Sequence, residues 1–570
     1  MQIPPIGSGP ILRFVLMLVL AGGALSRAAN VLNGLDDEKV QIVHESSFLE
    51  SVPERGTLPL TFEIRNAMDK PARWTFRFLS TQGWDRRKQM TSERQVDVPA
   101  KSSKTVRWEI PIFPNTEFSN SNQQSLMLTV LGPGSTAYEE QIMYSSANFY
   151  NSTNGMRLIA VSPELTITRE KWKYSAFQNE INTQNLPLHL APVNFDSIPD
   201  SMIGLSGMDV LLVTQDEWES LSSYHPLFLK WVAGGGQLIL VSETPQADRH
   251  IGLGTMQEIP FLDPEALIQK LGALPVIQNT LADTSAFTRR EWELVDAVPA
   301  IKSSFGWVML SVLVIAGLLG PLNIWSSFRK RNSMQVIWST PLISLVLSTL
   351  VALGIVFSDG FGGKGQRAAW ILLVPDQNLE LLVQEQVSRT GVLLSRRFSL
   401  PQDTEIYRVE SDSKRDRASV TYRQLADGGW AGDWFENRSI QAQVLRRDRT
   451  SRAEVLFTAG STPSVLSTVD AHFSRVLIRD KQGNYWSAEQ VAPGQETAMK
   501  SLRPTQAKKI LSELKTRKKS LFPGEQALNQ KGWFYAETSE KDRYLETLSS
   551  VKWQDRPLWV LGPVRQEERP

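Results

Sequence analysis

Two long uncharged runs near the middle of the chain constrain its fold more than any other feature. No charged residue occurs from Ser303 to Phe328 or from Asn332 to Ser358. A bilayer core about 30 Å thick requires roughly 20 helical residues, and both runs are long enough. They predict two transmembrane helices, over residues 305–325 and 336–357, joined by a short loop at 326–335. A pair of helices buried in a protein core is the alternative.

The loop between these runs predicts their orientation. Arg329, Lys330 and Arg331 form a compact basic cluster, and basic clusters in short loops remain in the cytoplasm. Both large flanking regions would then lie on the outer side of the membrane. Neither run contains an acid, a base or a histidine, which a proton or ion pathway would normally require. The pair is therefore interpreted as an anchor rather than a transporter.

An apolar run near the N-terminus predicts export. Residues Phe14 to Leu25 follow Arg13 and precede several small residues, an order typical of a secretory signal peptide, here predicted over residues 1–28. An uncleaved N-terminal anchor is the alternative. Either one would carry the chain that follows across the membrane, in agreement with the orientation predicted from the basic loop.

Residues 30–150 show the alternation expected of a β-sandwich. The segments TLPLTFEIRN, ARWTFRFLS and KTVRWEIPIF alternate apolar and polar side chains, as half-buried strands do. The turn clusters NAMDKP, PAKSS and GPGS separate the segments. Several short strands at this spacing predict an immunoglobulin-like sandwich.

Residues 155–275 change to an α/β pattern, and a linker is predicted at 276–304. MRLIAVSP, MDVLLVTQDEW and QLILVSE contain continuous apolar runs, which favour buried parallel strands. HPLFLKWVAGGG predicts a helix that ends at a glycine triplet. Strand, helix and strand at this spacing predict a βαβ unit with a right-handed crossover.

The segment MDVLLVTQDEWESLSSYHPLFLKWVAGGGQLILVSE resembles the core of class I glutamine amidotransferase-like domains, in the diverged form found in bacterial membrane proteins. The resemblance implies a flavodoxin-like layered fold. In active members, a turn after the strand matching QLILVSE presents a Cys nucleophile that pairs with a His. This chain has no cysteine, and its turn from Val241 to Pro245 lacks flanking glycines. Ser242 as a nucleophile with His250 as its base is one alternative. Ser242 as an ordinary loop residue is the preferred one.

A second β-rich region is predicted at 368–570, after a Gly-rich linker at 358–367. TEIYRVES, RASVTYRQL, IQAQVLRR and AEVLFTAG alternate apolar and polar residues. The stretch GPLNIWSSFRKRNSMQVIWSTPLISLVLSTL, followed later by RVLIRDKQGNYWSAEQVAPGQE, resembles a recurring bacterial pattern of a two-helix hairpin and a β domain. This resemblance implies an anchored outer-face protein and supplies no reaction.

A basic amphipathic helix is predicted from Pro504 to Phe522. Ala507, Ile510 and Leu511 share one face, and lysines dominate the rest. Contact with anionic lipid headgroups is one interpretation of this pattern. A helix docked on its apolar face with its basic face in solvent is the preferred alternative.

Composition excludes several classes of function. Lys and Arg number 61 against 60 Asp and Glu, so no basic field favours nucleic acid as a partner. The absence of cysteine excludes disulfides, thiolate nucleophiles and zinc-thiolate sites. No catalytic residue, cofactor or metal site is predicted.

The predicted protein is multidomain α+β: a β-sandwich, an amidotransferase-like α/β domain, two transmembrane helices and a C-terminal β-rich domain. The predicted function is a non-enzymatic, membrane-anchored binding or scaffolding protein of the bacterial inner membrane, with both large regions extracytoplasmic. Its expected partners are the lipid bilayer and a membrane protein. A hydrolase using Ser242 and an accessory subunit of a membrane transport complex are the alternative functions.

Overall fold

The computed structural model describes most of the chain from residue 30 to residue 568. The described residues are 30–31, 39–48, 53, 56–82, 89–112, 123–133, 138–146, 157–167, 181, 188–260, 264–273, 294, 298, short stretches and single positions between 309 and 349, 360–401, 403–409, 420–460, 462–515 and 530–568.

The N-terminal part contains two facing antiparallel sheets. The first has the order β1-β2-β3-β6. Alternation in β3 directs Leu58, Leu60, Phe62 and Ile64 inward, each exposed by 1% or less. The Phe62 ring lies 4.8 Å from that of Phe76 on the opposite sheet, so the two sheets share an aromatic core. The strands are β1 (Asn30–Val31), β2 (Val40–Ser46), β3 (Thr57–Asn66) and β6 (Ser102–Pro111) in the first sheet, and β4 (Ala72–Gln82), β5 (Gln89–Val98), β7 (Gln123–Leu131) and β8 (Tyr138–Ser146) in the second.

Strands from the distant C-terminal region complete the second of these sheets. Its order is β17-β20-β19-β5-β4-β7-β8. Strand β19 runs parallel to β5, with Val420 opposite Met90 and Gln424 opposite Arg94. The added strands are β17 (Phe398–Ser399), β19 (Val420–Gln424) and β20 (Gly429–Gly432). The chain therefore joins its early and late regions within one sheet.

A six-stranded sheet follows, with the order β10-β9-β11-β12-β14-β13. All neighbouring strands are parallel except β13 and β14. Every residue of β11 and β12 is buried, which explains why their sequences are continuously apolar. The elements are β9 (Arg157–Val161), α2 (Pro163–Ile167), β10 (Leu188–Pro192), η2 (Ile203–Leu205), β11 (Val210–Thr214), α4 (Gln215–Ser220), α5 (His225–Ala233), β12 (Gln237–Val241), β13 (Arg249–Ile251), β14 (Gly254–Ile259) and α6 (Pro264–Ala273).

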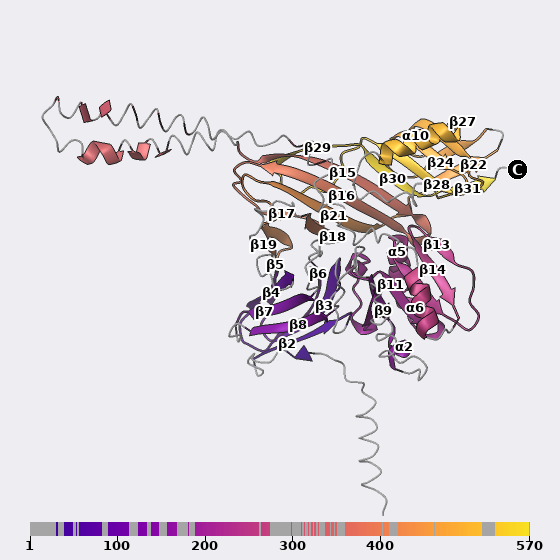
Figure 1. The fold of residues 1–570 in the computed structure, drawn as a ribbon, viewed down its shortest axis with the longest axis horizontal. Helices are drawn as coiled ribbons and strands as arrows, with labels where there is room; N and C mark the ends of the chain where they lie inside the picture. The colour runs from indigo at the N-terminus through magenta and orange to yellow at the C-terminus, as the bar shows by residue number, and fades with distance from the viewer. Residues whose placement is uncertain are drawn as a thin grey trace, which may run out of the picture.

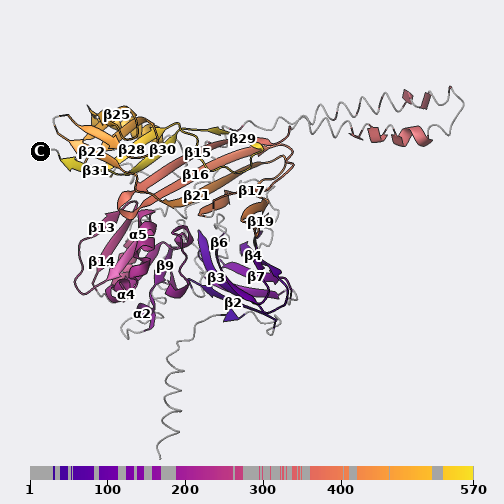
Figure 2. The ribbon, with the colours of Figure 1, turned by 180° about the vertical axis from the view of Figure 1, so that it is seen from behind.

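A long sheet built from the C-terminal region lies above both earlier parts (Figures 1 and 2). Its order is β18-β21-β16-β15-β30-β28-β24-β25-β27, with β29 also paired to β15. A smaller sheet, β26-β23-β22-β31, and the helix α10 (Pro504–Lys515) complete the region. The strands are β15 (Gly363–Val374), β16 (Leu379–Thr390), β18 (Thr404–Val409), β21 (Ile440–Thr450), β22 (Val455–Ala459), β23 (Ser464–Ser467), β24 (Phe473–Arg479), β25 (Tyr485–Val491), β26 (Glu496–Ala498), β27 (Lys500–Leu502), β28 (Trp533–Thr538), β29 (Val551–Asp555), β30 (Leu558–Pro563) and β31 (Arg565–Glu568).

The predicted fold class is wrong. Strands make up 51% of the structure and helices 18%, so it is mostly β. Residues 155–275 do not form a separate amidotransferase-like α/β domain. Their helices are short, and one hydrophobic cluster runs without a break from Phe62 through Trp231 to Leu561. The physical reason is that the core on one face of the six-stranded sheet, which includes Trp231 of α5, continues into the cores of the other parts of the chain.

The predicted transmembrane hairpin and the inner-membrane location are also wrong. Within the part of the chain that the structure describes, no helix has the length and apolar character needed to cross a membrane. Much of 305–325 and 336–357 lies outside the described residues, and the residues that are described there are helical. The signal peptide predicted at 1–28 also lies outside the described residues.

Candidate functional site at the junction of three sheets

Ser242 occupies an ordinary turn at the end of β12. Its hydroxyl oxygen accepts a hydrogen bond from the Thr244 backbone N–H at 3.2 Å, and its own N–H donates to the Ile259 carbonyl at 2.9 Å. Ser242 is not among the described non-glycine residues with left-handed backbone. The turn therefore lacks the strain of a nucleophile elbow.

His250 lies on the edge strand β13, where its side chain is exposed and Thr255 is its partner on β14. No hydrogen bond joins His250 to Ser242 in the described structure. A serine nucleophile needs a base within hydrogen-bond reach. The structure therefore does not bring together the two residues of the predicted alternative hydrolase.

A polar junction lies where all three large parts of the fold meet. Its centre is η2 and the flanking loop, here called the junction loop and defined as Pro199–Gly207. The helix η2 packs against both β3 and β21. On the β3 side, Thr57 donates to the carbonyl oxygens of Ile203 and Gly204, both at 3.1 Å. Its hydroxyl also lies 3.1 Å from that of Ser206.

Glu109 reaches the junction loop from β6. Its Oε1 accepts a hydrogen bond from the Ser201 hydroxyl at 2.9 Å. Burial raises the pKa of Glu109 to about 7, and the Ser201 hydrogen bond and the Arg94 charge only partly oppose this rise. Arg94 itself donates to the Arg107 carbonyl at 2.6 Å. Glu109 is thus a carboxyl group close to its point of half-ionisation at neutral pH.

Arg446 on β21 carries a charge into the interior. Its side chain is 0% exposed, and its three guanidinium nitrogens have no hydrogen-bond partner in the described structure. The guanidinium lies over the Tyr407 ring, 4.8 Å from its centroid. Since arginine stays protonated in proteins, this contact provides cation–π stabilisation in place of hydrogen bonds.

Glu405 and Tyr407 form the β18 side of the same cluster. The Tyr407 hydroxyl donates to Glu405 Oε1, while Glu405 Oε2 has no partner in the described structure. Burial raises the pKa of Glu405 well above its usual range, despite the nearby Arg446 charge. Burial likewise raises the pKa of Tyr407, whose hydroxyl is also hydrogen-bonded to Ser206 of the junction loop.

Asp448 connects β21 directly to the junction loop. Its carboxyl group accepts a hydrogen bond from the Met202 backbone N–H. Burial raises the pKa of Asp448 to about 6, with Lys230 opposing the rise and Asp403 adding to it. The carboxyl groups of Glu109 from the first sheet and of Glu405 and Asp448 from the long sheet therefore surround the junction loop, which belongs to the part that contains the six-stranded sheet.

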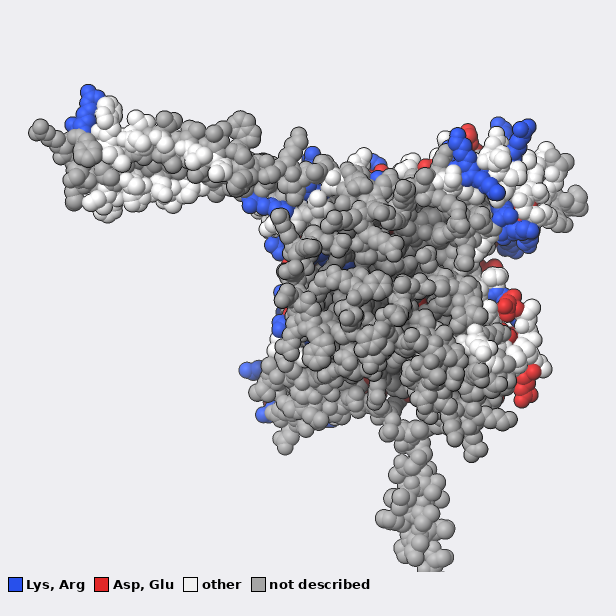
Figure 3. Space-filling model, in the orientation of Figure 1, with Lys and Arg blue, Asp and Glu red and all other residues white. Residues whose placement is uncertain are grey.

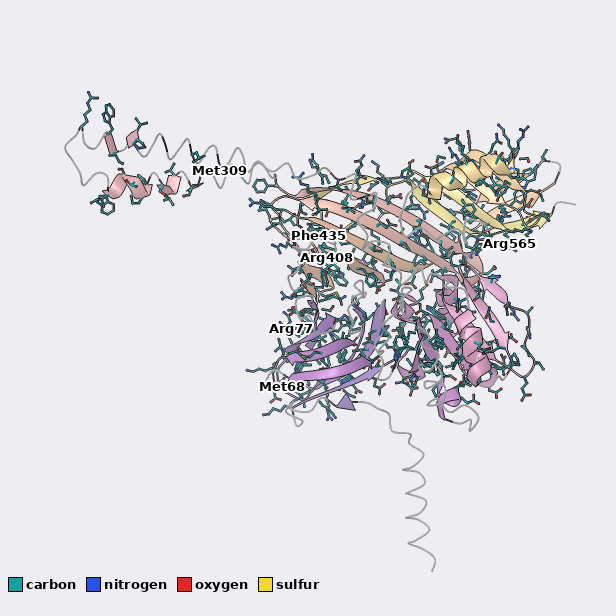
Figure 4. The ribbon with its side chains drawn as sticks, in the orientation of Figure 1. Met68, Arg77, Met309, Arg408, Phe435 and Arg565 are labelled. Atoms are coloured by element: carbon teal, nitrogen blue, oxygen red, sulfur yellow. The ribbon has the colours of Figure 1, made fainter. Side chains whose placement is uncertain are left out.

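A second connection fixes the shared sheet between the early and late regions. Glu93 on β5 is 3% exposed in its side chain and accepts from Arg77 at 2.7 Å and from Arg423 of β19 at 2.6 Å. Figure 4 labels Arg77 within this sheet. One buried carboxylate thus links strands that lie 330 positions apart in the sequence.

The helix α10 docks on the C-terminal region through its apolar side. Ala507 is 0% exposed and Leu511 is 4% exposed. Lys508 and Lys509 are exposed on the other side. Figure 3 shows basic side chains gathered at this corner of the molecule.

The segment Met309–Thr349, here called the arm, has a different surface. Its described helical pieces stand away from the three sheets in both ribbon views (Figures 1 and 2), and Figure 4 labels Met309 on it. The described atoms of the arm are almost all uncharged in Figure 3, apart from a basic tip. Arg329 lies over the Trp325 ring there, 5.5 Å from its centroid.

Comparisons with known proteins do not assign a family. No family model matches the chain, and no curated protein matches it. The chain is similar in part to a β-D-mannosidase from Dictyoglomus thermophilum at 8% identity and a TM-score of 0.19, covering 90% of this chain and 77% of that one. It is also similar to the yeast delta-COP mu-homology domain at 9% identity and a TM-score of 0.17, covering 36% and 96%. The putative ApaA protein from Bordetella pertussis gives 15% identity and a TM-score of 0.12, covering 19% and 89%. At these scores the similarities carry no functional argument.

Sequence reasoning missed the residues of the junction. The available signal was the polar content of the strand IQAQVLRRDRT, in which Gln441, Gln443 and Arg446 are all buried. An interior strand with that many polar groups requires partners. Gln441 and Gln443 find their partners within residues 386–441. The sequence does not reveal that Asp448 of the same strand meets Met202 of the junction loop.

Proposed function

We propose that this chain is a non-enzymatic binding or scaffolding protein whose arm docks onto a partner protein. The observation that carries the proposal is the exposure of large apolar side chains along the arm. Ten such side chains are between 49% and 78% exposed. They are Met309, Leu313, Leu322, Ile324, Trp325, Ile337, Trp338, Leu342, Leu345 and Val346.

Exposure on this scale is unfavourable for an isolated protein. Covering apolar surface contributes about 25 cal/mol per Å², and a contiguous exposed apolar patch usually marks an interaction site. Trp325 and Trp338 are 61% and 78% exposed, and tryptophan is prominent among residues that dominate binding energy. The chemistry of the partner is therefore an apolar protein surface that accepts aromatic and aliphatic side chains.

The rest of the fold supports a scaffolding role. The shared sheet, the Glu93 ion pairs and the junction loop join three regions into one body with a continuous core. Ser242 and His250 are not brought together for hydrolysis. A well-connected body with a projecting apolar surface suits a protein that holds partners in place.

The test is co-purification of the intact chain with its partners from native cells. The triple variant Trp338→Ser, Leu342→Ser, Leu345→Ser removes apolar surface from the arm. Leu394→Ser is the matched control, because Leu394 is 87% exposed and lies outside the arm. A stoichiometric partner should be recovered with the wild type and the control and lost with the triple variant. Equal recovery with the triple variant, or a solitary wild-type protein, would contradict the proposal.

A further inference from the structure

The junction loop is surrounded by carboxyl groups that have few compensating ion pairs. Glu109 contacts it through Ser201, and Asp448 contacts it through the Met202 backbone N–H. Glu405 approaches it through Tyr407, whose hydroxyl is hydrogen-bonded to Ser206. The charges of Glu109 and Asp448 both raise the pKa of Glu405. The three groups therefore form one acidic cluster around the junction loop.

The basic groups that face this cluster are imperfectly placed to neutralise it. Arg446 makes no hydrogen bond to any carboxylate in the described structure. Arg94 donates to a backbone carbonyl, and Lys230 acts on Asp448 from α5. Two other basic residues near the cluster are already paired with aspartates. These ion pairs are Arg107–Asp200 and Arg447–Asp403.

Ionising all three carboxyl groups would place like charges together in a region of low dielectric constant. Burial and nearby like charges both favour the protonated form of a carboxyl group. A protonated carboxyl group can still hydrogen-bond to Ser201 or to the Met202 backbone, so the contacts seen here do not require ionisation. The junction is therefore compatible with closed packing when its carboxyl groups carry protons.

We propose that the junction is a pH-sensitive latch: it holds the long sheet against the two N-terminal parts when the carboxyl groups of Glu109, Glu405 and Asp448 are protonated, and it loosens as they ionise. The shared sheet is also held by the pairing of β5 with β19 and by the ion pairs of Glu93 with Arg77 and Arg423, which involve none of these three carboxyl groups. Loosening therefore changes the packing of η2 against β21 and leaves the chain folded. In this way pH would control how rigidly the body is held together.

The direction of the effect follows from linkage. The pKa values of Glu109 and Asp448 in the folded protein are about 7 and about 6, above the ordinary carboxyl values of about 4. The packed state therefore binds more protons than the loosened state between about pH 4 and pH 7. Raising the pH through this range favours the loosened state.

Amide hydrogen exchange of the full-length protein at pH 5.5 and pH 8.0, corrected for the intrinsic exchange rate, tests the proposal. Amides of the junction loop and of β18 should exchange at least about tenfold faster at the higher pH. Amides of β11 and β12 should not change, because every residue of these two strands is buried. Equal corrected rates at the two pH values in the junction loop would overturn the proposal.

Isosteric variants assign the effect to named groups. The double variant Glu109→Gln, Asp448→Asn should keep slow backbone exchange at both pH values, because the side-chain amides of Gln and Asn mimic protonated carboxyl groups. Glu63→Gln, an exposed position on the adjacent strand β3, is the control and should keep the wild-type response. A folded double variant that retains the full pH response would overturn the proposal. If the double variant does not fold, the single variants decide, since each should reduce the response and full retention in both would overturn it.

Discussion

Arg446 on β21 and Glu405 on β18 lie directly opposite each other in the strand register, yet no hydrogen bond joins the guanidinium to the carboxylate. Both side chains are buried, at 0% and 8% exposure. Glu405 is instead hydrogen-bonded to Tyr407, and Arg446 lies over the Tyr407 ring. A buried pair without direct hydrogen bonds contributes little stability, so this arrangement is better explained by a protonated Glu405.

Replacing Arg446 tests that explanation. Arg446→Met keeps the packing of the side-chain stem and removes an uncompensated charge. We therefore expect it to lower the free energy of unfolding at pH 5.5 by less than about 1 kcal/mol, or to raise it. Urea denaturation followed by tryptophan fluorescence measures this. A loss of about 3 kcal/mol or more would mean that Arg446 compensates an ionised carboxylate.

The pH dependence of global stability provides an independent prediction. Because the raised pKa values of Glu109 and Asp448 are about 7 and about 6, the free energy of unfolding should decrease as the pH rises from about 4 to about 7 and then level off. Urea titrations across this range check it. The double variant Glu109→Gln, Asp448→Asn should flatten the curve, and an unchanged slope in that variant would show that other groups cause it.

Glu93 forms ion pairs with two arginines, and we expect its replacement to cost more stability than the replacement of one of them. Glu93→Gln should lower the free energy of unfolding by about 1–3 kcal/mol, because Arg77 and Arg423 both lose their acceptor charge. Arg423→Met alone should cost less, since Arg77 still neutralises Glu93. Arg73→Gln on the same sheet disrupts an exposed pair with Asp97 and should leave the urea midpoint unchanged. A larger effect at Arg73 than at Glu93 would contradict this assignment.

Two glycines form a matched pair for testing the core beside α5. A Cβ at Gly236 would lie 2.3 Å from the Trp231 ring, whereas a Cβ at Gly460 would meet nothing within 4 Å. Trp231 is 0% exposed and is among the largest fully buried side chains of the described structure. Gly236→Ala should therefore cost about 1–3 kcal/mol through overpacking, and Gly460→Ala should be neutral or slightly stabilising. Thermal unfolding of both variants measures the difference, and equal melting temperatures would contradict this packing.

Local patterns in the sequence predicted individual strands well. TLPLTFEIRN alternates and forms β3, and QLILV is continuously apolar and forms the buried β12. These successes reflect the fact that side-chain periodicity is imposed by the faces of one sheet. The parallel pairing of β19 with β5 left no comparable signal, because nothing local in RASVTYRQL identifies a partner strand 330 residues away.

The incorrect predictions share a physical cause. The uncharged runs at 303–328 and 332–358 report apolar composition, which does not by itself establish a helix that crosses a membrane. The strand–helix–strand pattern at 155–275 reports local structure, and it does not show that the core beside α5 continues into distant parts of the chain. The junction around Arg446 was missed because the inward or outward direction of a polar side chain is decided by elements far away in the chain.

The most direct measurement of the central proposal is the affinity of the intact chain for the partner recovered by co-purification, determined by calorimetric titration. Wild type and Leu394→Ser should bind with the same dissociation constant. The variant Trp338→Ser, Leu342→Ser, Leu345→Ser should bind at least about 100-fold more weakly, because loss of central aromatic and aliphatic anchors typically costs 2 kcal/mol or more. Unchanged affinity in that variant would contradict the assignment of the arm as the docking surface.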